Sequence, residues 1–238
     1  MWSAFVMVLV FAGLGIPAGI VLIPWTLLTG KIQPMYRLGQ WVSAAGIRAA
    51  GIRVVQHGRE NIPDRAVIFV PNHVSNLDPP IVVPLLPGTP SIMLKAELMK
   101  IPVLGRAWKI AKYVPVERGG GRESVIKATR YAAEVVRGGL SILIFAEGTR
   151  SRTGRLQPFK AGPFHIAEST GAPIVPMVIY GTETMMRKGS SKVYPGTAHI
   201  TFLPAVDPAE YPGRAALMAE VRRRMIEALP ENMRPENV

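Results

Sequence analysis

Residues 1–30 contain no charged side chain, and this run constrains the fold more than any other feature of the chain. As one helix it would be about 45 Å long at 1.5 Å per residue, whereas the hydrocarbon core of a bilayer is about 30 Å thick. Trp2 and Trp25 lie near its ends, where membrane interfaces favour aromatic rings. The sequence therefore predicts a membrane-inserting element in preference to a helix buried in a protein core.

Two prolines interrupt this apolar run. Pro17 and Pro24 each remove a backbone donor, so we expect a break or kink in a single rod. A bent, re-entrant or two-helix insertion therefore stays open beside one straight span. No Lys or Arg precedes the run, which disfavours a cleaved signal peptide.

The next segment, residues 31–53, is basic and amphipathic. It has no acidic residue, and its cations are Lys31, Arg37, Arg48 and Arg53. Its apolar side chains recur at roughly helical spacing: Tyr36, Leu38, Trp41, Val42 and Ile47. We predict a helix lying against anionic headgroups. The alternative is a helix packed on the globular domain.

Composition narrows the chemistry. The 28 Lys and Arg residues against 16 Asp and Glu give a net charge of +12, which indicates an anionic partner: nucleic acid, a membrane surface or a phosphorylated substrate. The chain has no Cys, which excludes disulfides, thiolate nucleophiles and Cys-based zinc sites. With only four His, a multi-histidine metal site is not expected.

After an N-terminal element, residues 1–52, the remaining chain (53–238) alternates apolar runs with helical patterns, which favours an α/β domain. The expected strands are Arg53–Gln56, Ala66–Val70, Ser91–Leu94, Tyr113–Val116, Ser141–Phe145, Ile174–Tyr180 and Ala198–Leu203. The expected helices are Pro79–Leu86, Gly105–Ala111, Arg122–Val136, Pro163–Glu168 and Gly213–Leu229.

His73 and Asp78 follow the first buried strand, and functional loops of α/β sheets lie at such strand ends. Asp78 precedes Pro79 and is also typical of a helix N-cap, while His73 could be an ordinary loop histidine. The interpretations are compatible, because a rigid Asp78 can accept the Nδ1 proton and leave Nε2 as a base. The chain has neither a G-x-S-x-G elbow nor a Cys. The base is therefore predicted to activate a substrate alcohol in a direct transfer.

Two further segments carry cations at strand ends. Arg118 and Arg122 flank a glycine run whose backbone N–H groups can approach an anion, although a flexible loop would have the same composition. The segment Phe145–Ser151 holds Glu147, which could also be a simple ion-pair partner, and Arg150. Together with the His–Asp pair, this layout is the one expected for a phosphorylated alcohol acceptor.

Four segments, in order, resemble the blocks of the glycerolipid acyltransferase family. They are His73-x4-Asp78 preceded by Asn72, Val116-Glu117-Arg118, Phe145–Ser151 and Ala172–Pro176. Ala146 replaces the family's usual Pro, and Glu117 stands where Asp is common. Neither departure removes a charge, so neither affects the implied chemistry.

The resemblance implies a mixed α/β sheet flanked by helices and transfer of an acyl chain to the 2-hydroxyl of 1-acylglycerol-3-phosphate (lysophosphatidate). His73 would be the base and Asp78 would orient it, while Arg118 would hold the phosphate. The other implied substrate-binding residues are Asn72, Glu147, Gly148, Thr149, Arg150 and Lys160. The donor would be acyl-CoA or acyl-carrier protein, and no cofactor or metal is implied.

These implications place the protein on the cytoplasmic face of a bacterial inner membrane rich in anionic lipids, with no nucleic-acid partner. An apolar channel must hold the acyl chain, and Ile81–Leu86 and Leu98–Leu104 are candidate linings that could equally be ordinary core.

Two alternatives stay open. One is the same chemistry with another acceptor, glycerol-3-phosphate or a lyso-aminolipid, and the other is a non-enzymatic basic protein that binds anionic lipid.

Overall fold

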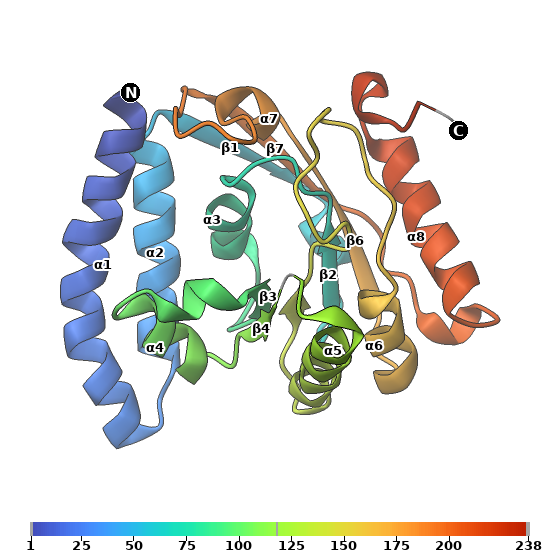
Figure 1. Ribbon diagram of the computed structural model, residues 1–238, viewed down its shortest axis with the longest axis horizontal. Helices are drawn as coiled ribbons and strands as arrows, with labels where there is room; N and C mark the ends of the chain where they lie inside the picture. The colour runs from blue at the N-terminus through green and yellow to red at the C-terminus, as the bar shows by residue number, and fades with distance from the viewer. Residues whose placement is uncertain (1, 118, 237–238) are drawn as a thin grey trace.

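A seven-stranded sheet forms the centre of the protein in the computed structural model, which describes residues 2–117 and 119–236 (Figure 1). The strand order is β1-β7-β6-β2-β5-β3-β4. The strands are β1 Ile52–His57, β2 Ile68–Pro71, β3 Ser91–Lys95, β4 Val114–Val116, β5 Ile142–Leu143, β6 Ile174–Tyr180 and β7 Gly196–Phe202. All seven expected strands are present, although β5 is shorter than Ser141–Phe145.

The sheet is mixed, as the resemblance implied. Strands β2 to β6 run parallel to one another, whereas β7 pairs antiparallel with β6 and carries β1 in parallel on its outer edge. Five parallel strands therefore end at one edge of the sheet, and the loops that follow them meet there.

Helices cover both faces of the sheet (Figure 1). Strand β2 shows why, because Ile68 and Val70 pack into one apolar cluster and Phe69 into the other. One layer contains α1 Trp2–Thr29, α2 Gln33–Ala49, α3 Asp78–Val82 and α4 Leu104–Ile110. The opposite layer contains α5 Gly121–Arg137, α6 Gly162–Thr170 and α8 Arg214–Ala228. A short helix that the sequence analysis did not expect, α7 Thr182–Met185, follows β6.

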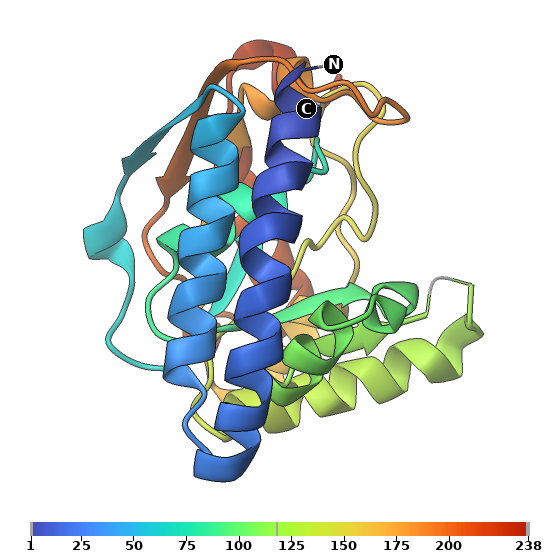
Figure 2. The ribbon, with the colours of Figure 1, turned by 90° about the vertical axis from the view of Figure 1, so that its left-hand side faces the viewer.

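The apolar N-terminus forms one continuous helix, α1, so the expected break at Pro17 or Pro24 is wrong. Each proline removes a single backbone donor. Helix α2 packs along α1 before and after these prolines, and this contact stabilises the continuous helix (Figure 2). The contact is close, since the ring of Phe11 occupies the space that a side chain at Gly46 would need. Among the described helices, α1 alone is long and apolar enough to cross a membrane, and 11% of its most apolar window is buried.

Helix α2 packs on the globular domain, which is the alternative interpretation of residues 31–53. Met35, Tyr36 and Ile47 are buried in the core, and the Tyr36 hydroxyl donates to the carbonyl of Pro90 at 2.7 Å. The cations of the segment are exposed on the outer side. The boundary at residue 52 stays a prediction, but the buried face of α2 is part of the α/β core.

Candidate active site

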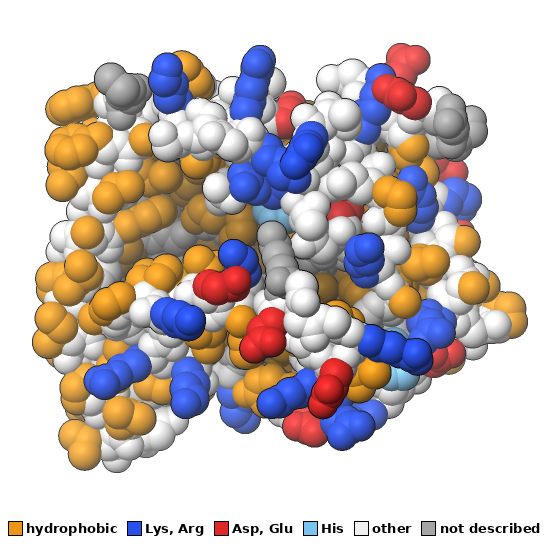
Figure 3. Space-filling model, in the orientation of Figure 1, with side chains coloured by type: hydrophobic (Ala, Val, Ile, Leu, Met, Phe, Trp, Pro, Cys, Tyr) orange, Lys and Arg blue, Asp and Glu red, His pale blue; other side chains and the backbone are white. Residues whose placement is uncertain are grey.

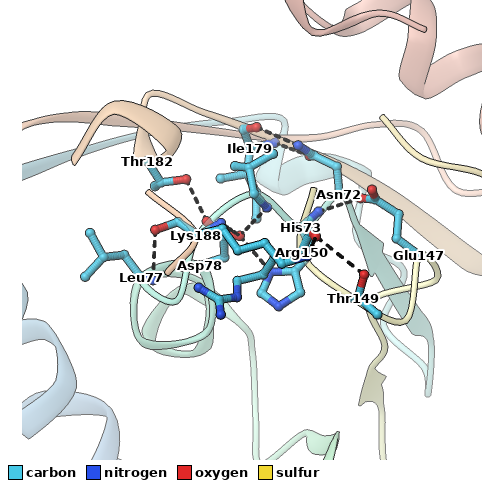
Figure 4. Close-up of polar contacts among 12 residues, drawn as sticks. Asn72, His73, Leu77, Asp78, Glu147, Thr149, Arg150, Ile179, Thr182 and Lys188 are labelled. Atoms are coloured by element: carbon cyan, nitrogen blue, oxygen red, sulfur yellow. Dashed lines mark hydrogen bonds and ion pairs between the residues drawn. The ribbon is translucent and has the colours of Figure 1, made fainter. Parts of the chain in front are cut away.

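The loops after β2, β5 and β6 meet at the edge where the parallel strands finish (Figure 4). His73 lies in the loop after β2 and Asp78 begins α3, which follows that loop. Arg150 comes from the loop after β5, and Thr182 from the segment after β6. Open α/β sheets bind ligands outside the carboxyl ends of their strands, so the arrangement places these side chains where a site is expected.

His73 and Asp78 form a buried pair. His73 Nδ1 lies 2.8 Å from Asp78 Oδ2, which also accepts the backbone N–H groups of Val74 and Ser75 at 2.8 Å each. The Thr182 hydroxyl donates to Asp78 Oδ1 at 2.6 Å. Because the carboxylate is the acceptor in every contact, His73 Nδ1 must donate its proton, and Nε2 keeps a free lone pair.

Asp78 does not cap the helix that it begins. Its carboxylate accepts N–H groups from Val74 and Ser75, which precede it, and no side-chain cap bond is formed at the start of α3. The N-cap interpretation is therefore wrong. The carboxylate instead folds the preceding loop around itself, which brings His73 back onto it.

Asn72 supports the pair from within the sheet. Its side-chain amide donates to the carbonyl of Ile179 at 2.8 Å and accepts the Ile179 N–H at 2.7 Å. Asn72 is buried, and both ends of its carboxamide are used in joining the end of β2 to β6. The structure therefore gives Asn72 a structural role, and the expected substrate contact stays a prediction.

Glu147 also holds His73 and does not line the groove described below. Its Oε1 accepts the His73 backbone N–H at 2.6 Å, and its Oε2 accepts the backbone and side-chain N–H groups of Gln157 at 2.9 and 3.0 Å. Burial raises the pKa of the Glu147 carboxyl to about 7, although these three donors act in the opposite direction. Its contacts in the structure fix the backbone at His73, and the expected contact with substrate stays a prediction.

An apolar groove of about 750 Å³ opens beside His73. Its walls come mainly from α1, α2, α4 and the chain around β3, and they include four residues of the two segments expected to line a channel: Val83, Leu98, Val103 and Leu104. The His73 ring stacks on Phe145 with centroids 4.0 Å apart. Figure 3 shows the hollow beside the apolar surface of α1, with Lys and Arg side chains gathered at its inner end.

Cations line the same groove. Arg150 lies there, and its Nη1 is buried without a hydrogen-bond partner among the described residues. Lys95, at the end of β3, also lines the groove and pairs with Glu97 at 3.2 Å. Lys95 is not among the predicted site residues, although its place directly after an expected strand was a usable signal. A buried guanidinium nitrogen without a partner favours binding of an anion beside it.

The other predicted site residues are distributed as follows. Gly148 lines the groove with φ of 73°, a conformation that favours glycine. Thr149 is exposed, and Lys160 is exposed with its aliphatic stem against Gly148. Arg118 lies outside the described residues. The loops after β2 and β5 thus bring together His73, Asp78, Gly148 and Arg150, while Asn72 and Glu147 support them.

A histidine base on a buried carboxylate, beside an apolar groove lined by two cations, defines a site for group transfer involving a lipid anion. The comparisons agree, because the sequence pattern of the acyltransferase family matches residues 53–180, and the chain belongs to that family. A 1-acyl-sn-glycerol-3-phosphate acyltransferase of Limnanthes douglasii is 32% identical over 189 residues, which cover 79% of this chain and 66% of that protein.

Bacterial relatives and a solved structure extend the similarity over most of the chain. The enzyme of the same name from Pseudomonas aeruginosa is 28% identical over 202 residues, or 85% of this chain and 76% of that protein. The crystal structure of the 1-acyl-sn-glycerophosphate acyltransferase from Thermotoga maritima has a TM-score of 0.84 at 26% identity and covers 95% of this chain and 92% of that one. The chain spans about two thirds of the length of the Limnanthes enzyme.

Proposed function

We propose that this acyltransferase moves an acyl chain from a thioester donor to the 2-hydroxyl of 1-acylglycerol-3-phosphate and so forms phosphatidate. The observation that carries the proposal is the His73–Asp78 pair, whose free Nε2 belongs to a ring lining the apolar groove. A base in this position can deprotonate the hydroxyl of a lipid acceptor that is bound in the groove. We take the identity of this acceptor from the names of the relatives.

The transfer needs one base. His73 Nε2 takes the proton of the acceptor hydroxyl while its oxygen attacks the thioester carbonyl. Asp78 stabilises the imidazolium that forms, because its carboxylate faces the Nδ1 proton at 2.8 Å. When the carbon–sulfur bond breaks, the imidazolium returns the proton to the departing thiolate. No covalent enzyme intermediate is required, in keeping with a chain that has no cysteine.

Arg150 is the described residue best placed to bind the acceptor phosphate. Its buried and unpartnered Nη1 and the nearby Lys95 supply positive charge at the edge of the groove that holds His73. A guanidinium group can hold phosphate oxygens in a bidentate manner. Arg118 remains our proposal for a further phosphate ligand, on the resemblance alone.

The apolar part of the groove would hold an acyl chain, and its position suits a bilayer. It lies between the α1–α2 pair on one side and α4 and β3 on the other, and α1 exposes large apolar side chains such as Phe5, Ile20 and Leu28 to the surroundings. Transfer at the interface avoids moving a chain into water, which costs about 0.8 kcal/mol per methylene group. We place the protein at the cytoplasmic face of a bacterial inner membrane, where acyl-CoA and acyl-carrier protein are the candidate donors.

The first test is acyl transfer in detergent micelles with purified protein, labelled acyl-CoA and 1-acylglycerol-3-phosphate. We expect the wild type to form phosphatidate and His73→Ala to lose about 10²- to 10⁴-fold in rate. Parallel assays replace the donor by acyl-carrier protein and the acceptor by glycerol-3-phosphate or a lyso-aminolipid. Turnover with another acceptor alone would overturn the assigned substrate. Equal rates for both proteins would overturn the role of His73, and lipid binding without turnover would indicate a binding protein.

A further inference from the structure

Thr182 contacts the Asp78 carboxylate from a segment far away in the chain. It follows β6 and begins α7, 104 residues after Asp78, and it is fully buried. The preceding residue, Gly181, has φ of 93°, and a side chain there would meet the carbonyl of Thr197. This sharp turn at the end of the strand directs the Thr182 hydroxyl onto Asp78 (Figure 4).

The two oxygens of Asp78 are supported very differently. Oδ2 accepts three N–H donors, from the His73 ring and from the backbone of Val74 and Ser75. Oδ1 accepts the Thr182 hydroxyl at 2.6 Å, and among the described residues it has no other hydrogen-bond donor. The χ2 torsion of aspartate has a broad energy minimum, so the carboxylate rotates easily. The hydrogen bond at Oδ1 therefore limits this rotation and keeps Oδ2 oriented toward the His73 ring.

A second contact keeps α7 against the same loop. The Ser75 hydroxyl donates to the carbonyl of Met186 at 2.9 Å, just after α7 ends. The loop after β2 is therefore attached to the segment after β6 at two points. Thr182 does not line the groove, so its side chain is not placed to touch either substrate.

We propose that Thr182 is a positioning residue for the reaction: its hydroxyl fixes the Asp78 carboxylate so that Oδ2 holds the His73 ring and faces the imidazolium formed during transfer. The inference rests on the proposed function. A neutral hydroxyl can support the carboxylate without supplying a competing positive charge. Its loss leaves a buried carboxylate oxygen without a donor, and hydrogen bonds to charged groups are the stronger ones.

The direct test compares Thr182→Val, which keeps the shape of the side chain and removes the hydroxyl, with Thr182→Ser, which keeps the hydroxyl. We expect Thr182→Val to lower kcat about 10- to 100-fold with an unchanged KM for both substrates. Thr182→Ser should retain wild-type kcat within about 3-fold. Thr184→Val is the matched control, because that hydroxyl lies in the same short helix and donates to Gly181 instead.

A double-mutant cycle separates positioning from general damage to the fold. In an Asp78→Asn background, Thr182→Val should change the residual rate by less than about 2-fold, because residues that act as a unit are not additive. If Thr182→Val is too unstable to purify, Thr182→Ala compared with Thr182→Ser isolates the same hydroxyl. Wild-type kcat in a variant without the hydroxyl, or an equal loss in the Asp78→Asn background, would overturn the inference.

A second readout does not depend on the substrate. The Nδ1 proton of His73 can be followed by ¹H–¹⁵N NMR of the labelled protein in micelles. We expect its resonance in the wild type, Thr182→Ser and Thr184→Val, and its loss by exchange in Thr182→Val. An unaltered resonance in Thr182→Val would contradict the inference even if the wild type failed to make phosphatidate, whereas that failure alone would count against the proposed function.

Discussion

Two carboxylates support His73 from different sides. Asp78 holds the ring, and Glu147 holds the backbone N–H of the same residue at 2.6 Å. The sequence predicted the first of these contacts, because the partners are five residues apart and a single turn joins them. It did not predict the second, or the contact from Thr182, because their partners are 74 and 104 residues away and meet only through the order of the strands.

The raised pKa of Glu147 makes a prediction about stability. A carboxyl whose pKa is about 7 when folded and 4.5 when unfolded binds more protons in the native state between these values. Its stabilising contribution is full below about pH 4.5 and is lost as the pH rises through 7, with an amplitude of about 3 kcal/mol. Glu147→Gln should therefore remove a fall in the free energy of unfolding that the wild type shows over this range.

Urea unfolding in detergent at several pH values from 4.5 to 7.5 measures this difference. Glu134→Gln is the matched control, since it removes an exposed carboxylate on α5 and should leave the pH dependence of stability as in the wild type. Parallel curves for the wild type and Glu147→Gln would show that the carboxyl does not titrate in this range.

At the scale of elements, most helices and strands could be predicted from the sequence, but the continuity of α1 and its packing against α2 could not. Hydrophobic periodicity located β6 at both of its bounds, Ile174–Tyr180, because a fully buried strand has a continuous apolar run. Local rules failed at Pro17 and Pro24, where packing of α1 against α2 overrides the tendency of proline to break a helix. This helix pair forms one wall of the groove, so the position of the groove depends on packing that no local pattern specifies.

The groove leads to a prediction about chain length. Gly39 lines it from α2, and a side chain built there has no atom within 4 Å, so Gly39→Leu should fold and occupy free space in the groove. We expect this variant to transfer long acyl chains several-fold more slowly than short ones, relative to the wild type. Gly13→Leu is the control, because Gly13 also has open space around it but lies outside the groove. The measurement is the transfer rate with acyl-CoA donors of 8 to 18 carbons. Equal chain-length selectivity in the wild type and both variants would show that the acyl chain does not bind in this part of the groove.

At the scale of the whole molecule, two surfaces could attach the protein to a membrane. One is the apolar side of α1, on which Ile20 and Val21 are 62% and 67% exposed. The other is the general positive charge, +12 for the full chain. The two differ in their response to salt. At 0.1 M salt, screening largely removes attraction between exposed charges more than about 10 Å apart, whereas apolar burial is left intact.

Membrane retention after a high-salt wash at pH 11 distinguishes these surfaces. The alkaline pH removes charge from lysine, so protein that stays in the pellet is held by apolar contact. We expect retention of the wild type and release of the double variant Ile20→Glu/Val21→Glu, because charged groups in the hydrocarbon region are costly. Lys127→Glu is the matched control, since it lowers the net charge by the same two units on an exposed side of α5 and should be retained. If the wild type is released, its binding is electrostatic; if the double variant is retained, a surface other than the exposed side of α1 holds the protein.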